Sequence, residues 1–258
     1  MDLDIRDLRV LVTAGAAGIG LEIARAFVRE GARVHICDID RQVLAAASST
    51  DPQLSQSVCD VSDRSQVSQL FDAALEVLGG LDCLVNNAGI AGPTGRVEEI
   101  DPDAWDRCLA VDLTGQFNCA RLAIPHLKAS GNASIMNLSS QAGKHGFPLR
   151  SAYAAAKWGV IGFTKTIAIE LGPLGIRVNA LLPGLVKGDR IRKVIEAKAH
   201  ENDLPFEEQE ANMFRSTSIK EYMTPQQLAD MVVFAASPRA RTISGQAISV
   251  CGDTNMLG

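Results

Sequence analysis

The stretch "RVLVTAGAAGIG", residues 9–20, decides the fold of this 258-residue chain. It opens with a short apolar run typical of a strand, and a glycine turn then leads into a helical pattern that begins near Ile19. Glycines at such a turn let the backbone approach a phosphate, and the helix N-terminus offers free N–H groups and a positive dipole. The stretch therefore predicts a phosphate cradle that includes Gly15, Gly18 and Gly20.

Short apolar runs alternate with longer amphipathic stretches along the rest of the chain. The predicted strands are residues 9–13, 33–38, 57–61, 83–87, 134–140, 177–183 and 247–252. The predicted helices are residues 19–30, 62–78, 101–130, 152–171 and 224–236. This alternation indicates βαβ units. We expect an α/β fold with a doubly wound, Rossmann-type parallel sheet of seven strands, forming a single domain over residues 1–258.

One charged segment, residues 187–222, has no place in that alternation. It lies between the sixth and seventh predicted strands, with a basic first half ("KGDRIRKVIEAK") and an acidic second half ("ENDLPFEEQE"). An insertion beyond the carboxyl end of a strand is placed to cover a site, so we expect a helical lid. A pair of solvated helices with local salt bridges is the alternative.

The second predicted strand ends in Asp38, about 20 residues after the glycine turn. A carboxylate at this place accepts hydrogen bonds from the adenosine ribose hydroxyls and repels a 2′-phosphate. The glycine turn holds no basic residue, and Arg41 is the nearest one after Asp38. The sequence therefore favours NAD over NADP as the cofactor. A glycine turn without a ligand is the alternative.

Two further strand ends fit the same cleft. Asp60 and Val61 end the third predicted strand, where an adenine ring finds one polar and one apolar contact. Asn87 follows the fourth strand in "NNAG", which supplies two amides and a small turn. Each of these segments, taken alone, is also typical of a turn that only ends a strand.

Tyr153 and Lys157 stand one helical turn apart in "SAYAAAKWG". Positions i and i+4 share a helix face, so the phenol and the ammonium are neighbours. A phenol is a poor base near neutrality, and a nearby cation favours the phenolate. Ser140 ends the fifth predicted strand, where its hydroxyl can hold a substrate oxygen against the phenol. The trio predicts proton transfer to or from an alcohol; a packed tyrosine beside a surface lysine is the alternative.

Through "TAGAAGIG", "NNAG", "SSQAGKHGFPLRSAYAAAK" and "LLPGLV", essentially the whole chain resembles the short-chain dehydrogenase/reductase family in its single-domain form. The resemblance implies that Tyr153 is the catalytic acid/base, that Lys157 holds the nicotinamide ribose and assists the tyrosine, and that Ser140 orients the substrate. It also implies the following nucleotide contacts: Gly18, Ile19 and Gly20 at the pyrophosphate, Asp38 at the adenosine ribose, Asp60, Val61 and Asn87 at the adenine and ribose, and Pro183, Gly184 and Val186 at the nicotinamide carboxamide. A homodimer or homotetramer is a further implication.

Two departures from the family pattern concern the site. Ala14 stands where the first cradle glycine is usual, and an alanine tolerates that turn only with a negative φ, which predicts a slightly reshaped loop. Asp112, in "VDLTG", replaces the usual asparagine that helps to hold a water leading from the lysine to solvent. An ionised aspartate only accepts hydrogen bonds. We expect Asp112 to be part of the catalytic set and to keep this water; a weakened relay is the alternative.

Composition argues against several other classes of protein. A net charge of −5 disfavours nucleic acid as a partner, and no apolar run approaches the roughly 18 residues of a membrane span. Six scattered cysteines and four dispersed histidines have no metal-ligand spacing, which predicts reduced thiols and no metal site. The opening residues do not have the pattern of a signal peptide, so we expect a cytoplasmic protein.

We therefore expect an NAD-dependent oxidoreductase that interconverts a small secondary alcohol and a ketone. Several cations near the expected mouth favour an anionic substrate: Lys144, His145, Arg150, Lys187, Arg190 and Arg192. Solvated surface charge is the alternative explanation for them. An NADPH-dependent reductase of carrier-bound ketoacyl groups is a second functional hypothesis, which Asp38 disfavours. A non-enzymatic dinucleotide-binding module is a third.

Overall fold

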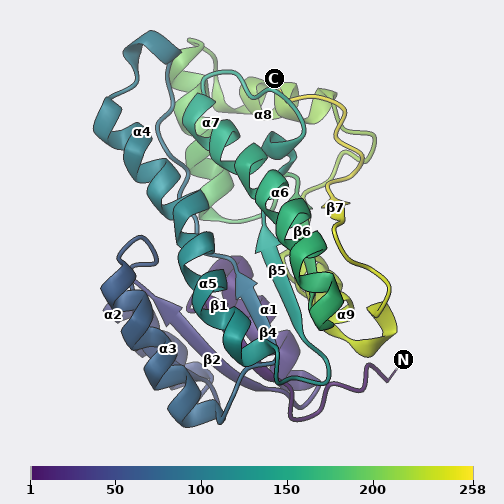
Figure 1. The fold of residues 1–258 in the computed structure, drawn as a ribbon. Coiled ribbons are helices and arrows are strands. Elements are labelled where there is room, and N and C mark those ends of the chain that lie inside the picture. The colour runs from purple at the N-terminus through teal and green to yellow at the C-terminus, as the bar shows by residue number, and fades with distance from the viewer. Residues whose placement is uncertain (1, 258) are drawn as a thin grey trace.

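A parallel β-sheet forms the centre of the computed structural model, which describes residues 2–257 (Figure 1). Over these residues the sheet has seven strands in the spatial order β3-β2-β1-β4-β5-β6-β7. The strands are β1 (Arg9–Thr13), β2 (Arg33–Asp38), β3 (Ser55–Val58), β4 (Cys83–Asn86), β5 (Ser134–Leu138), β6 (Arg177–Pro183) and β7 (Ala247–Val250). The chain reverses its direction of winding between β1 and β4, which creates a crevice outside their carboxyl ends.

Helices cover both faces of this sheet, which confirms the doubly wound, Rossmann-type prediction. They are α1 (Gly18–Arg29), α2 (Arg41–Thr50), α3 (Arg64–Leu78), α4 (Pro102–Leu109), α5 (Gly115–Leu127), α6 (Ser151–Leu171), α7 (Asp189–Glu201), α8 (Phe206–Arg215) and α9 (Pro225–Ala236). One core joins α1 and α9 to the sheet through residues such as Phe27 and Val232. The opposite core joins α3, α5 and α6 through residues such as Leu70 and Ile167.

The central strands are buried along their whole length because both faces of the sheet are covered. The edge strand β3 is only partly buried, and it begins two residues before the predicted range of 57–61. Its ladder with β2 pairs His35 with Ser55 at one end and Asp38 with Val58 at the other. The run "SQSV" is mostly polar and half exposed, so hydrophobicity gave no signal for its start.

The chain is helical from Pro102 to Leu127, within the predicted range of 101–130, but the sequence did not predict a change of helix type inside it. A π-helical turn, Ala110–Thr114, separates α4 from α5. Such turns are rare and occur frequently at functional sites. Here the turn carries Asp112, whose side chain is fully buried.

Helix α2 was missed in the sequence. Only Leu44 and Ala47 of its ten residues are buried, so its apolar pattern is weak. Its start is fixed locally, because the Asp40 carboxylate accepts hydrogen bonds from the first backbone N–H groups.

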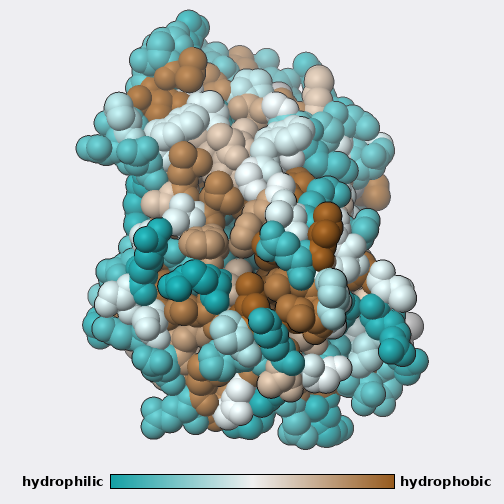
Figure 2. All heavy atoms as spheres, in the orientation of Figure 1, coloured by the Kyte–Doolittle hydropathy of each residue, from teal (hydrophilic) through white to brown (hydrophobic). Residues whose placement is uncertain are grey.

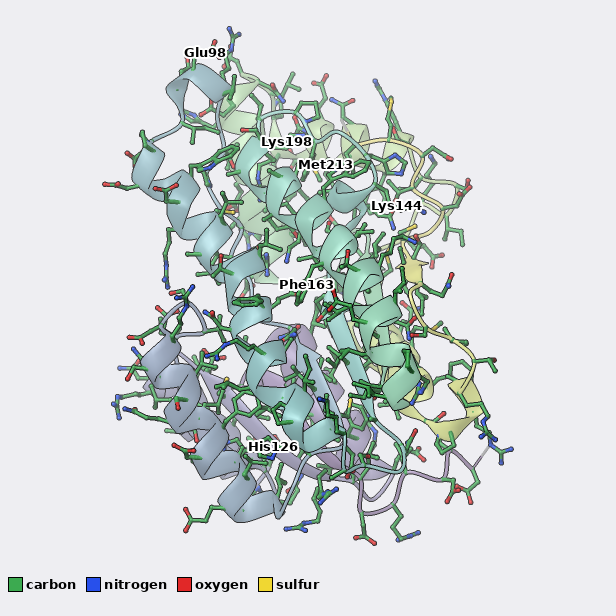
Figure 3. The ribbon with its side chains drawn as sticks, in the orientation of Figure 1. Glu98, His126, Lys144, Phe163, Lys198 and Met213 are labelled. Carbon is green, nitrogen blue, oxygen red and sulfur yellow. The ribbon has the colours of Figure 1, made fainter. Side chains whose placement is uncertain are left out.

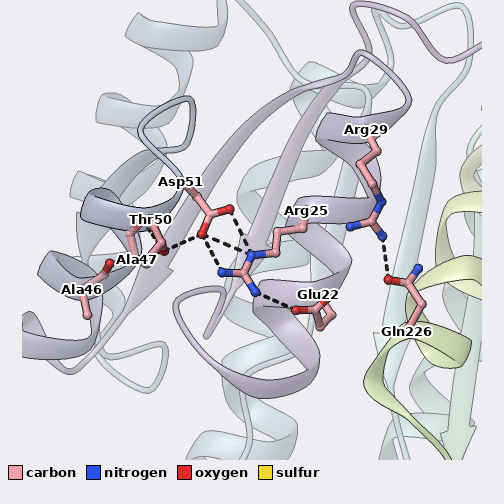
Figure 4. Close-up of polar contacts among 8 residues, drawn as sticks. All are labelled: Glu22, Arg25, Arg29, Ala46, Ala47, Thr50, Asp51 and Gln226. Atoms are coloured by element: carbon pink, nitrogen blue, oxygen red, sulfur yellow. Dashed lines mark hydrogen bonds and ion pairs between the residues drawn. The ribbon is translucent and has the colours of Figure 1, made fainter.

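Side-chain contacts tie α1 to the elements on either side (Figure 4). The Arg25 guanidinium lies 2.8 Å from a carboxylate oxygen of Asp51, just after α2, and 2.7 Å from one of Glu22. This hydrogen bonding to Arg25 lowers the pKa of Asp51. On the other side, Arg29 donates to the Gln226 side chain of α9 at 2.7 Å. The helix that follows the glycine turn is therefore held at both flanks.

The insertion, residues 187–222, forms two helices as expected, and α7 and α8 stack above the carboxyl ends of the strands (Figure 1). They enclose a small core of their own around Leu185, Ile195 and Met213. A parallel bridge between Val186 and Met223 joins the two ends of the insertion. These contacts do not fit the alternative of two independent solvated helices.

An apolar surface lies on the outer side of α5 and α6, where brown residues gather in the middle of Figure 2. Phe117, Trp158 and Ile169 are 41%, 53% and 80% exposed there. The rings of Phe117 and Phe163 meet edge to face, with their centres 6.4 Å apart. We call this surface the α5–α6 face.

Three features of residues 2–257 bear on disulfide bonding, metal binding and membrane insertion. The six cysteines are free and buried. Within the same residues, the histidine, cysteine and acidic side chains form no group of three that could hold a metal ion. None of the helices described is both long and apolar enough to cross a membrane.

We predict that His35 makes folding sensitive to acid. Its ring nitrogens lie 2.9 Å from the hydroxyl oxygens of Ser55 and Ser57, and burial lowers its pKa from 6.5 to about 4. The unfolded chain binds an extra proton between these pH values, so the free energy of unfolding falls as the pH drops from 6.5 towards 4. Urea titrations should show that the free energy of unfolding of the wild-type protein falls by about 2 kcal/mol more than that of His35→Gln when the pH drops from about 7 to about 5. Equal losses would contradict the prediction.

Candidate active site

A cavity of about 460 Å³ lies at the carboxyl edge of the sheet, between the strand ends and the insertion. The structure brings most of the predicted site residues together in its lining: Gly18, Ile19, Gly20, Asp38, Asn87, Ser140, Tyr153, Lys157, Pro183, Gly184 and Val186. Four predicted residues are not in the lining: Gly15, Asp60, Val61 and Asp112. The cavity therefore joins the end of β1 to the start of α6 in one space.

The N-terminus of α1 faces this cavity without a side-chain cap. Its N-cap residue, Ala17, has no side-chain acceptor, and its first turn has no acidic residue. By contrast, Asp40 and Asp63 cap α2 and α3 with their carboxylates. The first N–H groups of α1 are therefore available to an anion in the cavity.

Two glycines shape the turn that such an anion would meet. Gly18 has a φ of +52°, and a Cβ added there would meet no atom of the described residues within 4 Å. Gly20 is restricted by the protein itself, because a Cβ there would lie 2.1 Å from the Ala14 carbonyl oxygen and 2.5 Å from Asn87 Nδ2. The turn is thus open towards the cavity and tight towards β4. The donor set fits the pyrophosphate of a dinucleotide.

Ala14 corrects one expectation, because its φ is +49° and not negative. The loop keeps a left-handed residue at this place, at the steric cost that an L-residue with a Cβ has there. Its carbonyl oxygen accepts a hydrogen bond from Asn87 Nδ2 at 3.0 Å, and the same nitrogen lies 2.9 Å from the Thr13 carbonyl oxygen. Asn87 therefore fixes the turn after β1 against the turn after β4.

Three residues predicted to bind the cofactor lie outside the cavity lining and make contacts within the protein. Gly15 packs against β2, where an added Cβ would lie 2.7 Å from Ile36 Cβ. Val61 is buried in the core. The Asp60 carboxylate forms an ion pair with Arg107 of α4 at 2.8 Å. Because β3 ends at Val58, residues 59–61 form the connection to α3.

The reactive trio comes from β5 and α6. Lys157 Nζ lies 5.4 Å from the centre of the Tyr153 ring and donates to the Leu138 carbonyl oxygen at 3.1 Å. Lys157 is 3% exposed. Ser140 follows β5, and its Oγ accepts from the Ala142 N–H at 3.2 Å, which leaves its own hydroxyl proton free to donate. The three side chains share the lining of one cavity.

Asp112 lies behind Lys157 and outside the cavity lining. One carboxylate oxygen accepts from the Ile90 N–H at 2.6 Å, and the other lies 3.2 Å from Lys157 Nζ. The two side chains form a buried ion pair, since their exposures are 4% for Lys157 and 0% for Asp112. The aspartate therefore brings a negative charge next to the lysine cation.

Only part of the expected cation cluster reaches the cavity. Arg150, Lys187 and Arg190 line it, and the guanidinium carbons of Arg150 and Arg190 lie 5.1 and 5.9 Å from the centre of the Tyr153 ring. Figure 3 places Lys144 on the side of β7, away from the labelled Met213 and Lys198. His145 and Arg192 are also absent from the lining, and Arg192 pairs with Glu196 on α7.

The insertion also contributes an apolar wall, which was not predicted from the sequence. Ile191 and Val194 of α7 and Met213 of α8 line the cavity, and Phe147 packs against the same apolar cluster as Ile191 and Met213. Ile191 and Val194 are three residues apart, which places both on one face of a helix. This spacing could have predicted an apolar face turned towards the cavity. Lys198 continues that face, and its Nζ lies 4.6 Å from the centre of the Phe147 ring. Burial and the charge of Arg150 lower the pKa of Lys198 to about 8.

Comparison with known proteins gives matches along nearly the whole chain. A family model described as enoyl-(acyl carrier protein) reductase matches residues 14–253. D-β-hydroxybutyrate dehydrogenase of Cupriavidus necator is 34% identical over 245 residues, which cover 91% of this chain and 93% of that protein.

Two solved structures have the same fold over almost their full length. Actinorhodin polyketide ketoreductase with NADPH has a TM-score of 0.90 and 33% identity, covering 95% of this chain and 97% of its own. NAD⁺-bound xylitol dehydrogenase has a TM-score of 0.92 and 26% identity, covering 96% and 99%. The two structures hold different cofactors, so the fold alone does not choose between them.

We predict that Gly20→Ala weakens binding of NADH by at least about tenfold, because the added Cβ must displace the Ala14 carbonyl and reshape the cradle. Gly162→Ala is the control, since a Cβ at this exposed position of α6 meets open space. Fluorescence titration with NADH gives the affinities, and thermal denaturation reports folding. An unchanged affinity in folded Gly20→Ala would contradict the assigned cradle.

Proposed function

We propose that this chain, which belongs to the short-chain dehydrogenase/reductase family, is an NAD-dependent enzyme that interconverts a secondary alcohol and a ketone. Oxidoreduction at a hydroxyl or keto group follows from the family membership. The observation that carries the finer proposal is the shared cavity, which joins the open N-terminus of α1 to Ser140, Tyr153 and Lys157.

Each member of the trio has a role that its surroundings support. Tyr153 transfers the proton of the substrate hydroxyl, and the Lys157 cation nearby favours the phenolate that must accept it. Ser140 donates its hydroxyl proton to the substrate oxygen and holds it against the phenol. When bound, the dinucleotide supplies the partner that takes up or returns the hydride.

The cofactor would be held by three parts of the cavity. The pyrophosphate fits the N–H groups of Gly18, Ile19 and Gly20 at the start of α1. At the other end, β6 runs into Pro183, Gly184 and Val186, which we assign to the nicotinamide carboxamide. Gly184 packs closely on the C-terminal segment, since a Cβ there would lie 2.8 Å from Cys251 Cα.

Asp38 supports NAD over NADP. It ends β2 and lines the cavity, where its carboxylate is placed for ribose hydroxyls and repels a 2′-phosphate. Arg41, the nearest following basic residue, begins α2 and does not line the cavity. The NADPH-dependent ketoreductase remains the second hypothesis, because the ketoreductase structure that this chain resembles holds NADPH.

Two further features complete the proposal. We assign the α5–α6 face to pairing between copies in a homodimer or homotetramer, because the large apolar side chains of Phe117, Trp158 and Ile169 are exposed on these two helices. Six free, buried thiols fit a reducing compartment, so we propose a cytoplasmic enzyme. The alternative of a non-enzymatic module gains support only from Asp112.

We predict that Asp112→Asn changes turnover by less than about tenfold. The amide oxygen can still accept from the Ile90 N–H, and loss of the charge strengthens the field of Lys157 at the phenol, so the rise of kcat/KM with pH moves to lower pH. Rates of alcohol oxidation across pH measure this, with Asp106→Asn on the exposed side of α4 as the control. A larger gain in turnover would show that the aspartate impairs the proton relay.

We also predict that the chain reduces NAD with at least one secondary alcohol in a broad panel, monitored by NADH absorbance, and is at least about tenfold slower with NADP. Tyr153→Phe should lower kcat by about 10²- to 10⁴-fold because it removes the proton acceptor, while NADH affinity stays the same. Tyr222→Phe alters the only other tyrosine, which lies outside the cavity lining, and should leave kcat unchanged.

Three outcomes separate the hypotheses. Faster reaction with NADP would favour the ketoreductase. NADH binding without turnover of any alcohol or ketone would favour the non-enzymatic module. Full activity in Tyr153→Phe would overturn the assignment of the acid/base.

A further inference from the structure

Arg150 is a buried cation whose hydrogen bonding is incomplete. It is 1% exposed, and its Nη2 donates to the Ala91 carbonyl oxygen. Its Nε and Nη1 have no hydrogen-bond partner among residues 2–257. None of the ion pairs within those residues includes Arg150. Burial lowers the pKa of its guanidinium, which reflects the cost of keeping the charge there.

Two other buried cations of the fold are satisfied differently. Arg177 donates to the Asn132 side chain at 3.0 Å and to the Ala235 and Ala236 carbonyl oxygens. Lys157 has Asp112 at 3.2 Å. A buried guanidinium without an anion is costly, and native structures rarely leave such donors unpaired. Arg150 is therefore placed for a partner that does not belong to residues 2–257.

The unpaired donors lie beside the reacting position. Arg150 lines the cavity, and its guanidinium carbon lies 5.1 Å from the centre of the Tyr153 ring and 5.4 Å from that of Phe147. From the insertion, Arg190 approaches the same Tyr153 ring to 5.9 Å while donating to the Gly89 carbonyl oxygen. A substrate group bound by Arg150 would therefore lie only a few bonds from the substrate oxygen that contacts the Tyr153 hydroxyl.

The other charges around this place leave it positive. Lys187 and Arg190 line the cavity with Arg150, and Asp38 and Asp189 are the acidic residues in the lining. Asp189 is an exposed residue at the start of α7, and Asp38 ends β2. Asp112, the buried carboxylate nearby, is paired with Lys157. The acidic groups of the described residues do not supply a counter-ion to Arg150.

We propose that the missing partner is a carboxylate of the substrate, so that this chain acts on short hydroxy acids and keto acids. The proposal rests on the function proposed above and adds the substrate class. Arg150 orients the acid through its unused Nε and Nη1 donors, and Arg190 contributes positive charge from the insertion. Phe147, Ile191 and Met213 also line the cavity and supply apolar contacts for a short carbon chain.

The test measures binding to the enzyme–NADH complex, with straight-chain 2-, 3- and 4-oxo acids and their neutral amides as probes. At least one acid should bind at least about 30-fold more tightly than its own amide. Arg150→Gln should remove that preference while amide affinity changes by less than about threefold, and Arg150→Lys should retain part of it. Arg192→Gln is the control, because this arginine of α7 is exposed and pairs with Glu196 outside the cavity lining.

A second variant, Arg190→Gln, tests the inference even if the Arg150 variants do not fold. Arg190 lies on the insertion and its hydrogen bond is exposed, so we expect this variant to fold. It should weaken acid binding by about three- to tenfold without changing amide binding. Acids that bind no better than amides overturn the inference, even when NADH binds and neutral alcohols are oxidised. Loss of NADH affinity in folded Arg150→Gln also overturns it, because Arg150 then serves the dinucleotide. Failure of the native protein to bind NADH overturns the proposed function itself.

Discussion

The buried ion pair between Lys157 and Asp112 holds the reactive edge of this protein together. Asp112 belongs to the π-helical turn before α5 and also accepts from the Ile90 N–H in the loop after β4. Lys157 belongs to α6 and also donates to the Leu138 carbonyl oxygen at the end of β5. Four segments distant in sequence are thus fixed through two side chains. Because the pair is shielded from water, its geometry matters more than that of a surface pair.

Much of the fold could be predicted because its signals are local. The apolar runs of β1, β2 and β6 match the predicted ranges, since strands buried on both faces must be continuously hydrophobic. The prediction failed where structure depends on partners distant in the sequence. The edge strand β3 is polar and takes its bounds from pairing with β2, and α2 buries only Leu44 and Ala47. The π-helical turn between α4 and α5 holds no glycine or proline, and Gly115, which follows it, did not indicate a change in the helix.

The candidate site shows the same division between residues that local motifs identify and residues whose contacts depend on the fold. Gly18, Gly20, Asp38 and Tyr153 could be found because motifs with a strand–turn–helix context place them. Gly15, Asp60 and Val61 have similar sequence contexts, but they are not in the cavity lining: Gly15 packs on β2, Asp60 pairs with Arg107 and Val61 is buried in the core. Six cations were predicted near the mouth of the site, and the sequence alone does not show which of them would bind a substrate. Only the burial and incomplete hydrogen bonding of Arg150 distinguish it, and both are properties of the fold.

The π-helical turn at Ala110–Thr114 also bears on how sequence length can vary in this protein. Each residue of an α-helix advances the side-chain direction by about 100°, so removing one residue from the turn would let α4 and α5 join as one regular helix. The carboxylate would then rotate away from Lys157, although every residue of the glycine turn and of α6 remained unchanged. Single-residue deletions between α4 and α5 should therefore be tolerated far less well than deletions in the exposed loops at the opposite end of the sheet.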